Sequence, residues 1–119
     1  MKTTLVIGAS ENPSRYSHEA IKRLRDHGHD VVALGKKEGS VRDVKIQIGK
    51  PLLPAIDTVT LYINEQHQQE LQDYILDLKP KRIIFNPGAE NPALEKMAKE
   101  KGIETIEACT LTMLSIGAY

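Results

Sequence analysis

Residues 3–17 read TTLVIGASENPSRYS, and this stretch decides the fold class. Its first five residues are β-branched or apolar, which predicts a buried strand ending at Gly8. Ala20, Ile21 and Leu24 then recur at helical spacing, and Gly28 follows the expected end of that helix. A strand that turns through glycine into a helix is the opening unit of a parallel α/β sheet.

The same alternation continues along the chain. Further strands are expected at residues 31–34, 58–63, 82–86 and 103–106. Further helices are expected after the N-cap Asn64, after the pair Asn91-Pro92, and over residues 110–116. The expected fold is α/β: a three-layer, Rossmann-like open parallel sheet of about five strands in the order 3-2-1-4-5, with helices on both faces.

Residues 35–56 fit this pattern least well. The segment is long for a bare loop, and Pro51 and Pro54 disfavour a crossover helix. Residues 44–48 alternate between apolar and polar and could form a small extra strand. We interpret the segment as an irregular connection.

Composition excludes several classes of function. The 119 residues suffice for one hydrophobic core, so a single domain over residues 1–119 is expected. Sixteen basic and sixteen acidic residues give a formal net charge of zero, which disfavours nucleic-acid binding. One cysteine provides neither an internal disulfide nor a metal cluster. Without a signal peptide or a membrane-spanning apolar run, the expected compartment is cytoplasmic; a homo-oligomer is possible.

The turn after the first strand is the strongest candidate for a ligand site. Ligands of open parallel sheets bind at the carboxyl ends of the strands. Gly8, Ala9 and Ser10 are small, so backbone amides there could approach an anion closely, next to the N-terminus of the following helix. Arg15 could add a charged clamp on a phosphate. The alternative is an ordinary strand-to-helix turn that needs glycine.

The end of the second strand indicates which nucleotide is preferred. It reads Leu34-Gly35-Lys36-Lys37, without the acidic residue that would hold an NAD ribose. Ser10 also stands where the dinucleotide fingerprint has its second glycine. The two lysines suit an extra phosphate, as in NADP or coenzyme A, or they belong to a solvated loop.

Cys109 follows the fifth strand and should lie at the same edge. It is interpreted either as a small buried apolar residue or as a redox-active or ligand-contacting thiol. No histidine base accompanies it or Ser10, so no catalytic residue and no metal ligand is assigned, and an enzyme is not expected.

The loop at residues 6–17 resembles the opening of the small stand-alone CoA-binding domain proteins, which are similar to the N-terminal domain of the succinyl-CoA synthetase α subunit. The resemblance continues through residues 28–32, 57–62, 85–91 and 107–109, so it extends over essentially the whole chain. It implies a Rossmann-like fold that binds coenzyme A or an acyl-CoA. We expect residues 1–119 to form this domain alone, without the second domain of the synthetase, which puts ligase chemistry in doubt.

The resemblance also implies a role for each candidate residue. The pyrophosphate loop would contain Gly8, Ala9, Ser10 and Asn12, with Arg15 and Tyr16 beside it, while Gly35, Lys36 and Lys37 would face the nucleotide phosphates. Tyr62, Ile63 and Asn64 would line the adenine side, and Pro87, Gly88 and Cys109 the pantetheine side. We therefore expect a non-catalytic carrier or sensor of coenzyme A; the alternative is a regulatory module that binds NADP or another nucleotide.

Overall fold

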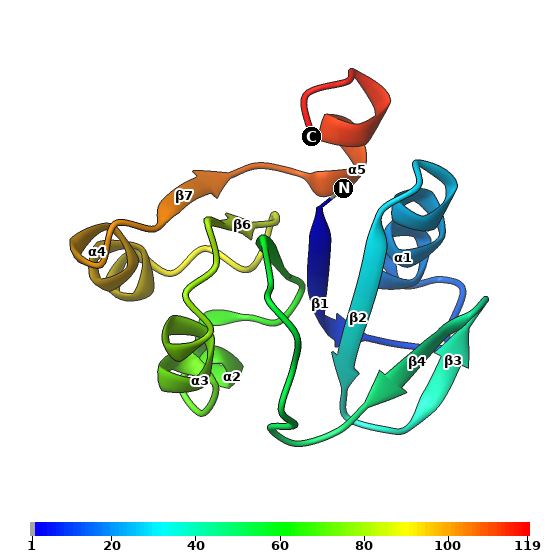
Figure 1. Ribbon diagram of the computed structural model, residues 1–119, viewed down its shortest axis with the longest axis horizontal. Helices are drawn as coiled ribbons and strands as arrows, with labels where there is room; N and C mark the ends of the chain where they lie inside the picture. The colour runs from blue at the N-terminus through cyan, green and yellow to red at the C-terminus, as the bar shows by residue number, and fades with distance from the viewer. Residues whose placement is uncertain (1) are drawn as a thin grey trace.

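A seven-stranded sheet forms the centre of the computed structural model, which describes residues 2–119 (Figure 1). The strands run in the order β3-β4-β2-β1-β5-β6-β7, and all neighbours are parallel except β3 and β4. Their bounds are β1 Thr3–Ala9, β2 Asp30–Gly35, β3 Gly39–Val41, β4 Val44–Gln47, β5 Thr58–Leu61, β6 Arg82–Phe85 and β7 Glu104–Glu107.

Helices cover both faces of the sheet, as the sequence predicted. Two of them, α1 Tyr16–Asp26 and α5 Thr110–Ser115, pack on one face, where Val6, Ile21 and Leu114 share a core. The other face carries α2 Glu65–Gln68, α3 Gln72–Asp77 and α4 Pro92–Glu100. None of these helices is long and apolar enough to cross a membrane.

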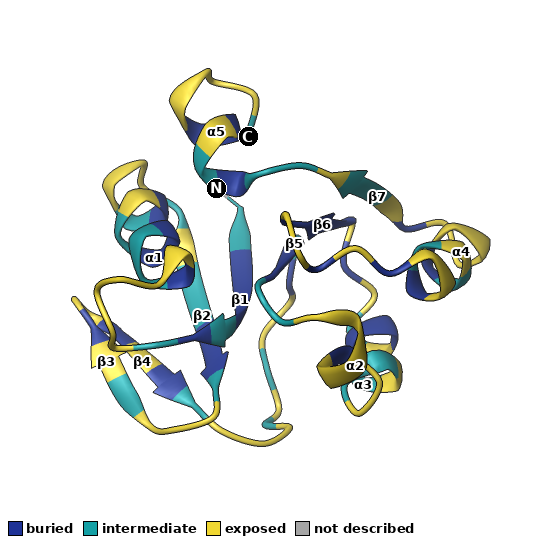
Figure 2. Ribbon diagram, turned by 180° about the vertical axis from the view of Figure 1, so that it is seen from behind, coloured by how far each residue is buried: buried dark blue, intermediate teal, exposed yellow. Residues whose placement is uncertain are grey.

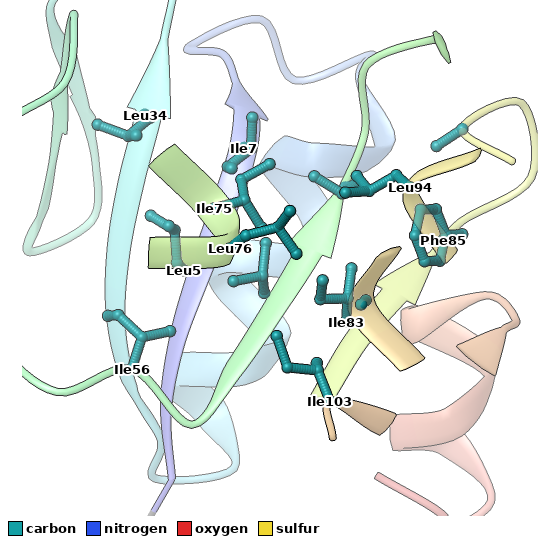
Figure 3. Packing of buried hydrophobic residues seen from close by; sticks show 14 residues of the cluster. Leu5, Ile7, Leu34, Ile56, Ile75, Leu76, Ile83, Phe85, Leu94 and Ile103 are labelled. Carbon is teal, nitrogen blue, oxygen red and sulfur yellow. The ribbon is translucent and has the colours of Figure 1, made fainter. Parts of the chain in front are cut away.

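The larger core lies on the α3 and α4 face (Figure 3). Leu5, Ile7 and Ile83 project from the strands toward Ile75 and Leu94 of the covering helices, and all five are almost completely buried. The strands at the centre of the sheet are buried along most of their length, whereas the outer helix faces are exposed (Figure 2). This packing fixes the carboxyl ends of the strands in place.

The strand order is where the prediction was wrong. Residues 58–61 lie beside β1, on the side away from β2, instead of beyond β2. The place beside β2 is taken by β4, which pairs Ala33 with Ile46 and Leu34 with Gln47. The segment interpreted as an irregular connection thus contains the hairpin β3-β4, and its second strand fills the edge position that the third strand was expected to occupy.

Two helix starts were predicted correctly. The side chain of Asn64 accepts a hydrogen bond from the His67 amide at 3.0 Å, and that of Asn91 accepts one from the Leu94 amide at 3.1 Å. The helix expected after Asn64 forms as two short helices, α2 and α3, rather than one.

Candidate functional site

Five segments meet at the carboxyl edge of the parallel strands. The pairing places Ala9 opposite Gly35, Ile7 opposite Leu61, and Phe85 opposite both Leu61 and Glu107. The residues that follow these positions therefore lie in one row, in the order 36–38, 10–16, 62–64, 86–91 and 108–110. Every candidate residue from the sequence lies in this row or at the strand ends that begin it.

Gly8 makes the turn at the centre of this row. Its φ is +95°, and the β1–β2 register shifts at this point. A Cβ atom at Gly8 would lie 3.0 Å from Ile63 Cγ2 and 3.1 Å from the Tyr62 carbonyl carbon. Glycine is needed both for the backbone angle and for the close approach of the β5 loop.

The loop after β1 is shaped by its own short polar side chains. The Asn12 amide donates to Ser10 Oγ at 3.0 Å, and Asn12 Oδ1 accepts hydrogen bonds from the Ser14 amide at 3.0 Å and hydroxyl at 2.8 Å. The Arg15 amide donates to the Asn12 carbonyl at 3.0 Å. These turns bring Arg15 to the N-cap of α1, where free amides and the positive end of the helix dipole face the loop.

The edge carries three exposed cations. Arg15, Lys36 and Lys37 are exposed, and within residues 2–119 none of them forms an ion pair. Lys36 directly follows Gly35, which is opposite Ala9 in the β1–β2 register. A Cβ atom on Gly35 would overlap the Ala9 carbonyl, so the lysine turn begins in contact with the loop after β1.

A buried amide pair joins the loops after β5 and β6. Gln68, which is fully buried, donates to the Ile63 carbonyl at 2.8 Å and to the Ala89 carbonyl at 2.7 Å. Its Oε1 accepts a hydrogen bond from Asn91 Nδ2 at 2.9 Å. The segment with Asn64 is thereby held at a fixed distance from the segment with Pro87 and Gly88, both of which are exposed.

A second buried network joins β5, β6 and α5. Asn86 Nδ2 donates to Thr60 Oγ1 at 2.7 Å and to the Leu61 carbonyl at 2.8 Å, while Asn86 Oδ1 accepts from the Thr110 amide at 2.8 Å. The hydroxyls of Thr60 and Thr110 are 2.8 Å apart. Sequence reasoning missed Asn86 and Gln68 because all the partners of Asn86, and two of the three partners of Gln68, are more than twenty residues away. The sequence signal that could have identified Asn86 is a side-chain amide directly after a buried strand.

The side chains of Tyr62 and Tyr16 differ in their exposure. Tyr62 packs its ring against the α1 and α5 core, and burial raises the pKa of its phenol well above the usual value. Its backbone therefore lies at the edge while most of its ring belongs to the interior. Tyr16, at the first turn of α1, is 75% exposed and stands beside the loop after β1.

Cys109 is half-buried at the N-cap of α5. Burial alone would raise the pKa of its thiol, but the nearby amide and hydroxyl of Thr112 and the amide of Leu111 outweigh burial and lower the pKa. The thiol therefore carries more thiolate at neutral pH than an ordinary cysteine.

The arrangement is chemically suited to a phosphorylated ligand. It combines a glycine turn, the N-terminus of an eleven-residue helix and three cations free of ion pairs within residues 2–119. The part of the chain that the structure describes holds no group of three His, Cys, Asp or Glu residues placed to bind a metal ion.

Comparison with known proteins agrees with this geometry. A family described as "CoA binding domain" matches residues 2–115. No match was found among curated proteins.

Solved structures share the fold over nearly the whole chain. A crystal structure described as that of an uncharacterized protein is 49% identical, with a TM-score of 0.96, over 100% of this chain and 98% of the other. A protein from Thermus thermophilus, cell-free ID.343, is 23% identical with a TM-score of 0.86, over 99% and 90% of the two chains. The acetyl-coenzyme A synthetase 1 of Ca. Korarchaeum cryptofilum is 15% identical with a TM-score of 0.72, and 90% of this chain covers 25% of that protein.

Proposed function

Because the chain belongs to the CoA-binding domain family, we propose that it binds coenzyme A at the carboxyl edge of its sheet. In this proposal the protein acts in the cytoplasm as a carrier or sensor of CoA or acyl-CoA and catalyses no reaction of its own. The observation that carries the proposal is the set of three unpaired cations, within residues 2–119, around the glycine turn. Coenzyme A has a pyrophosphate and a separate 3′-phosphate, and these cations lie on two adjacent segments of the edge.

Each part of the ligand has a proposed position. The pyrophosphate lies over residues 8–10, next to the amides at the start of α1 and the side chain of Arg15. The 3′-phosphate faces Lys36 and Lys37. The adenine lies beside residues 62–64, where the backbone of Tyr62 rather than its buried ring is available, and the pantetheine arm runs along Pro87, Gly88 and Cys109.

The absence of chemistry is proposed from the kinds of side chain at the edge. Ser10 Oγ accepts the Asn12 amide, so its hydroxyl helps to shape the loop. Apart from the thiol of Cys109, the remaining candidates are small, amide, aromatic or cationic groups, which are suited to binding and orienting an anion. We propose that residues 1–119 work as one binding domain.

A thermal-shift panel tests the ligand. The full chain is heated with CoA, acetyl-CoA, dephospho-CoA, NADPH and NADH. A ligand present at about 100 times its Kd adds roughly 2.7 kcal/mol, which for a domain of this size raises Tm by roughly 10 °C. We expect a clear shift with CoA and a smaller one with dephospho-CoA. No shift with CoA would refute the proposal, and a shift with NADPH alone would favour the NADP-binding alternative.

Charge reversal tests the site. Lys36→Glu places a carboxylate where the 3′-phosphate is proposed to lie, so it should weaken CoA binding much more than it weakens binding of dephospho-CoA. Lys81→Glu is the matched control, because Lys81 is exposed just before β6, at the opposite edge of the sheet. Equal affinities of both variants for CoA would move the site away from the lysine turn.

A further inference from the structure

The lysine turn at residues 36–38 is attached to the loop after β1 at both of its ends. At its start, Gly35 lies against the Ala9 carbonyl, as described above. At its end, the Ser40 amide donates a hydrogen bond to Glu11 Oε2 at 2.9 Å. The two attachments bracket the lysines, so the position of the turn relative to the loop is fixed from both sides.

Gly39 makes the second attachment possible. A Cβ atom at Gly39 would lie 2.7 Å from Cγ and from Oε1 of Glu11. The Glu11 side chain therefore occupies the space that a side chain at position 39 would fill. Gly39 is in turn paired with Ile46 across the β3–β4 hairpin. A carboxylate in a loop that faces anions would ordinarily repel them, but this one is turned aside and bound to a backbone amide.

We infer that Glu11 is a positioning residue for the proposed CoA site: by binding Ser40, it holds the lysine turn beside the loop after β1, and so sets the preference for a ligand that has a third phosphate next to its pyrophosphate. The inference rests on the proposed function. Glu11 does not itself touch the ligand. It acts through the relative position of Lys36 and Lys37 and the loop that holds Arg15.

The experiment compares CoA with dephospho-CoA by titration calorimetry on the full chain. The quantity of interest is the ratio of the two dissociation constants, because it isolates the contribution of the 3′-phosphate. In the wild-type chain this ratio should be about tenfold in favour of CoA, as expected for a charge-assisted contact at a partly exposed site. In Glu11→Ala it should fall to within about twofold.

Two variants separate positioning from charge. Glu11→Gln keeps an oxygen that accepts the Ser40 amide and removes the negative charge, so it should keep the ratio and bind both ligands at least as tightly as the wild type. Glu38→Ala removes the same charge from within the turn, where Glu38 is exposed, and should leave the ratio at or above the wild-type value. A ratio in Glu11→Ala that stays at the wild-type value, with both affinities lowered equally, would overturn the inference.

The wild-type result separates this inference from the proposed function. If the wild-type chain binds neither ligand, both the function and the inference are refuted. If it binds both equally, CoA binding stands and the positioning role is refuted. Hydrogen exchange gives a readout that needs no ligand: the Ser40 amide should exchange faster in Glu11→Ala than in Glu38→Ala, and equal rates would refute the attachment.

Discussion

Gly8→Ala tests the close approach of the β5 loop to the Gly8 turn at the centre of the candidate site. The substitution places a side chain at φ +95° and brings its Cβ atom to 3.0 Å from Ile63 Cγ2 and 3.1 Å from the Tyr62 carbonyl carbon. The first contact is to the Cγ2 methyl group of Ile63, which can move only if this β-branched side chain rotates about its stiff χ1 bond. The second is to backbone held in the sheet, since the Tyr62 amide donates to the Ile7 carbonyl at 2.9 Å.

The expected cost has two parts. Placing an L-residue at positive φ costs about 1–2 kcal/mol. Forcing an extra carbon into a packed contact adds about 1–3 kcal/mol. The sum is about 3 kcal/mol, which a domain with a stability of about 5–15 kcal/mol survives in the folded state. The displaced Tyr62–Ile63 backbone also lies at the ligand edge, so affinity for CoA should fall as well.

Gly28→Ala is the matched control. Gly28 has φ +81°, and a Cβ atom there would meet nothing within 4 Å. Gly28→Ala should therefore cost only the unfavourable backbone conformation, about 1–2 kcal/mol, and leave ligand binding unchanged. With a urea m-value of about 2 kcal/mol/M, the two variants should differ in denaturation midpoint by about 1 M. Equal midpoints would refute the tight approach of Tyr62 to Gly8.

Three further predictions concern groups away from the turn. Asn86→Leu removes three buried hydrogen bonds and should lower the free energy of unfolding, measured in urea, by about 3–4 kcal/mol. A loss below about 1 kcal/mol would contradict the contribution of the buried network that joins β5, β6 and α5. The pKa of the Cys109 thiol is lowered from its ordinary value of 9.0, so its alkylation by iodoacetamide should reach half its maximal rate below pH 9.0. A midpoint above that value would contradict the lowering of the pKa by the polar groups of Leu111 and Thr112. Burial, helped by nearby Lys2, His27 and Arg82, lowers the pKa of His29, so the unfolded chain binds the proton more readily. The free energy of unfolding should therefore fall as the pH drops below about 6.5, and His29→Gln should reduce this slope. An unchanged slope in His29→Gln would contradict the effect of burial on this ring.

Five of the seven strands, β1, β2, β5, β6 and β7, could be predicted from the sequence because each contains a short apolar or β-branched run with a glycine, proline or asparagine close to one end. Their order could not, because periodicity identifies a strand without identifying its neighbour. The decisive residues were 44–47, which alternate and form β4. Once β4 is counted as the third parallel strand, the usual order 3-2-1-4-5-6 gives the observed β4-β2-β1-β5-β6-β7.

The position of the candidate site could also be predicted, because the carboxyl ends of parallel strands share one edge. The contacts that hold its segments together could not. Gln68 looks like a surface residue in a polar helix, and only the folded chain brings it to the Ile63 and Ala89 carbonyls. Glu11 looks like an unfavourable charge in an anion loop until Ser40, twenty-nine positions away, is seen to bind it.

The distribution of charge explains how a chain with no net charge can attract a small anion. Several basic side chains around α1 are neutralised locally: Arg23 pairs with Glu19, Arg25 with Asp43, and Arg42 with Asp26. The cations of the candidate site have no such partner within residues 2–119. Because salt screens charges beyond about 8–10 Å, a nucleotide at this edge responds to the nearby cations and to the amides at the start of α1.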